Sequence, residues 1–132
     1  MKDITHIIQT AKKTIFLSDN FIDDGSFKVL SKKNRNVSVK IYSNNALAYN
    51  PRNVKRRNDF KDKLKIFFTS HFTDRFLIID EKFMFLLSRP VKDNNKKGFE
   101  AIRMMDYSEI ERQIIKMQKC EENCRRYGWH RK

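Results

Sequence analysis

The sequence is poor in the residue types that mark several protein classes. Cysteine occurs only at Cys120 and Cys124, which argues against a disulfide-stapled secreted scaffold. Three glycines and two prolines are too few for a disordered or low-complexity chain. Residues 1–6 lack the apolar core of a signal peptide, and no apolar run approaches the length of a membrane span. We therefore expect an intracellular, cytoplasmic protein.

Acidic residues are also scarce: the chain has 16 Asp and Glu against 29 Lys and Arg, a formal net charge of +13 at pH 7. This imbalance makes the compact state repel itself, and the usual partner that relieves it is a polyanion whose counterions are released on binding. An anionic membrane would satisfy the same electrostatics, but there is no long basic amphipathic helix, lipidation motif or apolar anchor. We therefore expect nucleic acid or a nucleoprotein complex as partner, and no membrane.

Eleven phenylalanines supply enough aromatic bulk for one hydrophobic core, and the length suits one domain over residues 1–132. The apolar spacing predicts a helix over 4–13 and a buried strand over 14–19. A short helix ending near Asn34 and an alternating strand over 37–42 follow. This order of strand, helix and strand favours a parallel crossover.

The second half of the chain contains further strand signals. The apolar signal fades from Asn44 to Asp62, which predicts a loop, and then returns over 64–69, 74–80, 82–88 and 99–105. The short connections at 70–73 and at Glu81 predict antiparallel hairpins or sharp bends.

The C-terminal segment, residues 107–132, is predicted to be a helix followed by a basic tail. Ser108 and Glu111 have the spacing of a capping box, and an apolar stripe runs through Ile110, Ile114 and Met117. Together the elements predict an α/β fold with a single mixed β-sheet flanked by helices.

Two cysteines and a histidine near the C-terminus, Cys120, Cys124 and His130, have a spacing that zinc sites allow. Only these three candidate ligands cluster, and both cysteines continue the apolar stripe of the helix. Reduced thiols that pack inward are the better interpretation. We expect no metal site and no cofactor.

The most informative segment places Thr73, Arg75 and Asp80 in the pattern Thr-x-Arg-x4-Asp, with Ser88 downstream. This pattern resembles the phospholipase D superfamily, whose motif is H-x-K-x4-D followed by a small hydroxyl-bearing residue. The resemblance spans most of residues 3–106 and implies a phospholipase D-like half-domain. The alternative is a purely structural role, in which Arg75 and Asp80 are ordinary strand-end residues beside a turn.

The resemblance implies a degenerate catalytic site. In the family, histidines attack phosphorus and protonate the leaving oxygen while lysines stabilise the phosphoryl oxygens. Here Thr73 stands in the histidine position without a nearby base, whereas Arg75 in the lysine position can still hold phosphate. On an extended strand His71, Thr73 and Arg75 would point to one side, with His71 about 7 Å upstream, so His71 is the alternative nucleophile.

Basic residues interleaved with aromatics suit phosphate contact and base stacking. Because no base-reading motif accompanies them, we expect contacts to the nucleic-acid backbone. The candidate nucleic-acid-binding residues are Arg52, Lys55, Arg56, Arg57, Lys61, Lys63, Arg125, Arg126, Trp129 and Arg131.

Three functions follow from these observations. The first is a catalytically inactive phospholipase D-like domain that binds nucleic acid in a mobile-element, phage or defence nucleoprotein system. The second is an active, metal-independent phosphodiesterase or nuclease, a homodimer that uses His71. The third is a protein inhibitor or regulator that docks on a nucleoprotein complex.

Overall fold

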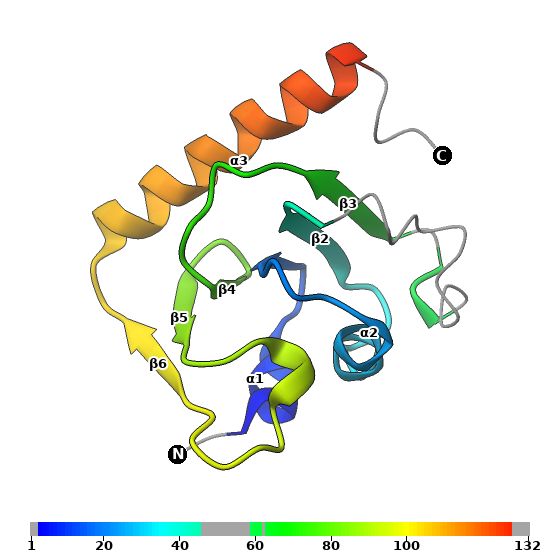
Figure 1. The fold of residues 1–132 in the computed structure, drawn as a ribbon, viewed down its shortest axis with the longest axis vertical. Coiled ribbons are helices and arrows are strands. Elements are labelled where there is room, and N and C mark those ends of the chain that lie inside the picture. Colours follow the sequence, from blue (N-terminus) through cyan, green and yellow to red (C-terminus); the bar gives the residue numbers. More distant parts are fainter. Residues whose placement is uncertain (1–2, 46–58, 62, 128–132) are drawn as a thin grey trace.

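The computed structural model describes residues 3–45, 59–61 and 63–127, with only the backbone described for 124–127. Strands and helices follow one another along the chain (Figure 1). They are α1 (Ile4–Thr10), β1 (Thr14–Ser18), α2 (Asp24–Leu30), β2 (Ser38–Ser43), β3 (Leu64–Phe68), β4 (Phe76–Ile79), β5 (Phe83–Leu87), the 3-10 helix η4 (Val91–Asp93), β6 (Ala101–Met104) and α3 (Tyr107–Tyr127).

The six strands form one sheet in the order β3-β2-β1-β4-β5-β6. Strands β1, β2 and β3 are parallel, whereas β4, β5 and β6 pair antiparallel with their neighbours. The predicted fold class, a single mixed sheet flanked by helices, is confirmed. The predicted parallel crossover is confirmed as well, because α2 connects the adjacent parallel strands β1 and β2.

The two short connections have different outcomes. The hairpin predicted at Glu81 is confirmed: Asp80 and Glu81 have φ angles of 55° and 59°, and Lys82 N–H donates to the Ile79 carbonyl at 3.0 Å. At 70–73 the hairpin alternative is wrong, because β3 and β4 are separated in the sheet by β2 and β1, whereas the alternative of a bend is met at Ser70.

Two apolar layers cover the two faces of the sheet. Under α1 and α2 lies a core that includes Ile8, Leu17 and Phe27. Under α3 lies a second core, rich in aromatic rings, that includes Phe72 and Cys120. Figure 1 shows α3 running along one side of the sheet and α1 and α2 lying on the other. The inward packing predicted for Cys120 is confirmed.

The start of α3 differs from the predicted capping box. Ser108 does not cap the helix; instead the Asp106 carboxylate accepts from the Ser108 N–H at 2.9 Å and from its hydroxyl at 2.7 Å. An acidic side chain near a helix N-terminus is favoured by the helix dipole. None of the helices in the described ranges has the length and apolar character needed to cross a membrane.

The topology brings the ends of all six strands to two edges of the sheet. Strands β1, β2, β3 and β5 end at the edge where β4 and β6 begin, which we call the carboxyl edge. The opposite edge, where the three parallel strands begin, is the amino edge. Polar loops gather at both edges, since the two faces are covered by apolar layers.

Candidate functional site

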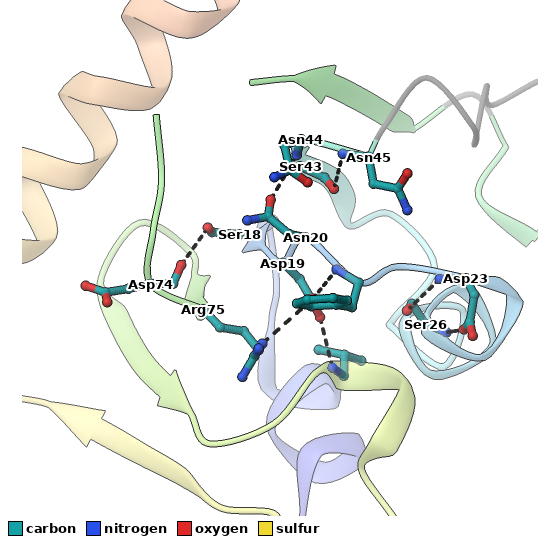
Figure 2. A network of polar contacts seen from close by, with 12 residues as sticks. Ser18, Asp19, Asn20, Asp23, Ser26, Ser43, Asn44, Asn45, Asp74 and Arg75 are labelled. Carbon is teal, nitrogen blue, oxygen red and sulfur yellow. Dashed lines mark hydrogen bonds and ion pairs between the residues drawn. The ribbon is translucent and has the colours of Figure 1, made fainter. Parts of the chain in front are cut away.

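The centre of the carboxyl edge lies between β1 and β4, which are neighbours although β2 and β3 separate them in sequence. Residues that follow β1 therefore meet residues that precede β4. In open α/β sheets, ligands bind at the carboxyl ends of strands where the strand order diverges. Here Asp19 follows β1 and Arg75 precedes β4 (Figure 2).

Asp19 is the buried anchor of this site. Its side chain is 0% exposed. One carboxylate oxygen accepts from the Phe21 N–H and the other from the Val91 N–H, both at 2.9 Å. Burial raises the pKa of Asp19, against the lowering effect of these two backbone donors and of the nearby Arg75 and Lys92. A carboxylate held by two amides is a fixed counter-charge for a cation.

Arg75 is paired with this carboxylate and still has donor capacity. Its Nε lies 3.8 Å from Asp19 Oδ1, within ion-pair range, but it is buried and makes no hydrogen bond to any residue that the structure describes. The guanidinium carbon lies 5.9 Å from the centroid of the Phe21 ring, which is 56% exposed. A guanidinium held between an anchoring carboxylate and an exposed ring is already oriented to bind an anion.

The backbone at Arg75 is fixed from two sides. The Ser18 hydroxyl donates to the Asp74 carbonyl at 2.9 Å, and the Leu87 N–H donates to the Arg75 carbonyl at 3.0 Å. Figure 2 shows the first of these bonds next to the Asp19–Arg75 pair. Both neighbouring strands, β1 and β5, thus hold the residue that precedes β4.

A second cation approaches from the connection between β5 and β6. Lys92 Nζ lies 3.7 Å from Asp23 Oδ2, the carboxylate that caps α2. The backbone approaches closely here: a Cβ at Gly25 would lie 3.1 Å from Asp23 Oδ1 and 3.5 Å from Lys92 Cβ. A side chain at position 25 would therefore press against the capping carboxylate of Asp23, while its distance to Lys92 would be an ordinary van der Waals contact.

Sequence reasoning found Arg75 but missed Asp19, Phe21 and Lys92. An aspartate directly after a buried strand is the signal that could have found Asp19. Phe21 and Lys92 carry no such signal, because their roles depend on the pairing of β1 with β4 and on the course of the β5–β6 connection.

His71 and Thr73 do not lie on an extended strand. β4 begins at Phe76, a bend occurs at Asp74, and both His71 and Thr73 are exposed. The expectation that His71, Thr73 and Arg75 alternate along one strand is therefore wrong. The His71 N–H donates to Thr69 Oγ1 at 3.1 Å, so its backbone belongs to the turn after β3.

Asp80 lies at the amino edge, at the far end of β4 from Arg75. Its carboxylate accepts from the backbone N–H groups of Lys12, Lys13 and Thr14 at 3.0, 2.7 and 3.1 Å. Desolvation works to raise its pKa, but these three donors and the charge of Lys13 outweigh it and hold the pKa below its usual range. Five residues of extended chain span about 16 Å. Arg75 and Asp80 therefore do not line one cleft, contrary to what the resemblance of their motif implied.

Ser88 closes the connection between β5 and β6. Its hydroxyl donates to the Gly98 carbonyl at 3.0 Å and accepts from the Glu100 N–H at 2.7 Å. Ser88 directly follows Leu87, the partner of Arg75, so it does lie at the carboxyl edge. Its hydroxyl is engaged by this loop.

The predicted nucleic-acid-binding residues divide by what the structure describes. Lys61 and Lys63 precede β3 and lie exposed at the amino edge. For Arg125 and Arg126 only the helical backbone of α3 is described. Outside the described residues lie Arg52, Lys55, Arg56, Arg57, Trp129 and Arg131. Within residues 3–45, 59–61 and 63–127, no three His, Cys, Asp or Glu side chains are grouped as a metal site.

No protein-family model matches this chain, and no curated protein matches it. Several solved structures resemble it, among them NucT and TrmBL2. NucT from Helicobacter pylori matches with a TM-score of 0.59 at 16% identity, over 90% of this chain and 85% of NucT. TrmBL2, an archaeal chromatin protein whose structure shows a novel mode of DNA binding, matches with a TM-score of 0.51 at 16% identity, over 96% of this chain and 51% of TrmBL2. The chain therefore has a phospholipase D-like fold.

Proposed function

We propose that this chain is a nucleic-acid-binding, catalytically inactive phospholipase D-like domain that acts in a mobile-element, phage or defence nucleoprotein system. The observation that carries the binding proposal is the geometry at Arg75. Its guanidinium pairs with the buried Asp19 carboxylate and lies beside the exposed Phe21 ring. The net charge of +13 supplies the long-range attraction for a polyanion.

A phosphodiester fits this arrangement. Guanidinium groups bind phosphate oxygens through charge-assisted, often bidentate hydrogen bonds, and here the side chain is already oriented by Asp19. Phe21 offers a ring face on which an unpaired base can stack. Phosphate and base would then be bound by adjacent side chains, without reading the base edges.

The absence of a nucleophile–base pair supports inactivity. Within the described residues, Thr73 makes no hydrogen bond with a histidine or carboxylate side chain that could activate its hydroxyl. Asp19 is committed to two backbone amides and to Arg75. The phosphate-binding half of the family's chemistry is therefore retained here without the attacking half.

The structural neighbours support the same class of partner. The structure of TrmBL2 is described as showing a novel mode of DNA binding, and 96% of this chain is covered by that match. Lys61, Lys63 and the basic residues outside the described ranges are proposed as further backbone contacts. Pairing of two copies across the motif also remains a proposal.

Fluorescence anisotropy with labelled single-stranded and duplex oligonucleotides tests the binding proposal. Arg75→Ala removes one charge-assisted contact and should weaken binding about tenfold or more. Lys119→Ala is the matched control, since Lys119 is an exposed cation on α3, an element that contributes no residue to the Asp19–Arg75 pair. Equal affinities of the Arg75→Ala and Lys119→Ala variants would overturn the assignment of Arg75.

A cleavage assay in EDTA tests inactivity separately. We expect the wild-type protein to leave single-stranded and duplex oligonucleotides intact. Cleavage that disappears in the His71→Ala variant would establish the active phosphodiesterase instead, without affecting the binding proposal. Absence of binding to every oligonucleotide, with capture of a partner that survives nuclease treatment, would favour the protein regulator.

A further inference from the structure

A separate basic hollow lies at the amino edge, at the other end of the sheet from Arg75. It has a volume of about 310 Å³ and is lined by Ser31, Lys33, Arg35, Asp59 and Lys61. The first three lie on the connection from α2 to β2, and the last two shortly before β3. The lining thus carries three cations and one carboxylate. We call this set the amino-edge hollow.

Lys33 gives the hollow a positive charge that no ion pair within the described residues neutralises. The residue is only 9% exposed, and its Nζ donates to the carbonyls of Asn34 and Arg35 at 3.3 and 3.4 Å. The same Nζ lies 5.8 Å from the centroid of the buried Phe60 ring. No carboxylate of the described chain lies within ion-pair distance of it, so neutral groups alone hold this ammonium.

The neighbouring cations reinforce this charge. Burial lowers the pKa of Lys33, and the positive charges of Lys63 and Lys61 lower it further. Asp59 is the one carboxylate on the lining and offsets part of the charge. An anion placed among these side chains would relieve both the desolvation and the mutual repulsion.

We propose that the amino-edge hollow binds a phosphate group, and that a nucleic-acid backbone is its source. Lysine acts as a point charge for phosphate and arginine as a planar donor pair, and both are present. The phosphate chemistry stands on the hollow itself, while the source of the phosphate rests on the proposed function. This site is distinct from Arg75 because the two lie at opposite edges of the sheet.

The separation predicts a dependence on ligand length. Strands of five or six residues place the two edges about 20 Å apart. A dinucleotide is too short to reach from one site to the other, whereas a single-stranded 20-mer can occupy both. A longer strand that occupies both gains affinity through effective concentration.

The first test uses the double variant Arg35→Gln/Lys61→Gln, which changes two exposed side chains and spares buried Lys33. Binding of a single-stranded 20-mer should weaken about tenfold, while binding of a dinucleotide changes less than threefold. Lys82→Gln/Lys119→Gln removes the same charge from exposed positions outside the hollow and should change the 20-mer affinity less than twofold. Equal losses in both double variants would overturn the proposal.

A variant that is expected to strengthen binding provides a test that misfolding cannot imitate. Asp59→Asn removes the only carboxylate among the described lining residues and should tighten binding of pyrophosphate about twofold, as shown by NMR shifts of the Lys33 and Arg35 amides. Unchanged or weaker binding would overturn the hollow as a phosphate site. Pyrophosphate binding without any 20-mer effect would retain the phosphate chemistry and overturn the nucleic-acid source. Loss of binding in Arg75→Ala alone would affect only the carboxyl edge.

Discussion

At the carboxyl edge, Arg75 lies beside the buried carboxylate of Asp19, whereas at the amino edge Lys33 is tethered only to backbone carbonyls. The first cation is oriented by an ion pair and adjoins an exposed ring, Phe21. The second is concentrated with other cations around a hollow. An oriented cation and a high density of positive charge both favour polyanion binding. In this sheet the first lies at the carboxyl edge and the second at the amino edge.

The two edges also use their aspartates differently. Asp19 is fully buried and neutralises a cation, whereas Asp80 accepts three backbone donors that precede and begin β1. The pKa of Asp19 is raised by burial, and that of Asp80 is lowered by its hydrogen bonds despite desolvation. The position of an acidic residue in a motif pattern therefore does not show whether its carboxylate serves binding or stability.

The largest effect is expected for Asp80→Ala. Three backbone N–H groups lose a charged acceptor, which should cost about 2 kcal/mol of unfolding free energy and lower Tm by about 8 °C. Because the folded pKa of Asp80 lies below its unfolded value, this stabilisation is present above the unfolded pKa and is lost as pH falls through the folded pKa. Urea denaturation between pH 7 and pH 3 would measure both.

Asp74→Ala is the matched control for that experiment, since Asp74 is exposed and its backbone carbonyl, not its carboxylate, accepts from Ser18. Its stability should stay near the wild-type value. If folded Asp80→Ala also lost oligonucleotide affinity as Arg75→Ala does, Asp80 would belong to the binding surface, and the division of roles between the edges would fail.

The next largest effect concerns Phe21. Phe21→Ala should weaken single-stranded binding about tenfold and leave duplex binding nearly unchanged, because only an unpaired base can stack on the ring. The chain offers a close control in Phe83, which is 37% exposed with the Arg103 guanidinium 4.8 Å from its ring centroid. Phe83→Ala should leave both affinities unchanged. Equal losses for single strands and duplex in Phe21→Ala would contradict base stacking.

The sequence predicted the elements well because their patterns are local. The alternation at 37–42 and the apolar burst at 14–19 marked β2 and β1 within about one residue. The hairpin predicted between β3 and β4 was wrong, because the local pattern of the connection, residues 69–75, is the same whether the chain turns back or crosses two strands. The mixed sheet itself followed from a crossover in the first half and hairpins in the second.

The site was only partly predictable. Arg75 and Asp80 stood out through their spacing, but spacing along a strand cannot tell which end of it faces a ligand. The Asp19–Arg75 pair joins residues that are 56 positions apart in the chain. Lys33 and Arg35 gave no signal, because their charge matters only next to Lys61, which another connection brings to the amino edge.

A smaller effect distinguishes the two edges by the salt dependence of their binding affinity. Each phosphate contact on a single strand contributes about 0.7 to the slope of log affinity against log salt. Arg75→Ala should therefore lower that slope by about 0.7, and Arg35→Gln/Lys61→Gln by about 1.4. Anisotropy titrations of a 20-mer across a salt series would give both values. Equal slopes in these two variants would mean that removing two cations from the amino-edge hollow affects counterion release no more than removing Arg75 alone.

The smallest expected effect is on the pH dependence of binding, which should differ between the amino edge and the carboxyl edge. Because the pKa of Lys33 is lowered, first by burial and then by Lys63 and Lys61, its ammonium loses its proton at a lower pH than an ordinary lysine. Pyrophosphate binding in the amino-edge hollow should thus weaken as pH rises on the alkaline side. A guanidinium keeps its charge over this range, so binding of a dinucleotide at the carboxyl edge should change less.

Lys33→Arg isolates this effect, because a guanidinium in the hollow does not titrate and the titration of pyrophosphate itself is common to both proteins. The variant should bind pyrophosphate with a flatter pH profile than the wild type, and Asp59, Lys61 and Lys63 are present in both proteins. NMR titrations between pH 7 and pH 10, on a variant with wild-type Tm, would measure the difference. Identical profiles would mean that Lys33 holds no ligand charge, and the hollow would then depend on Arg35 and Lys61 alone.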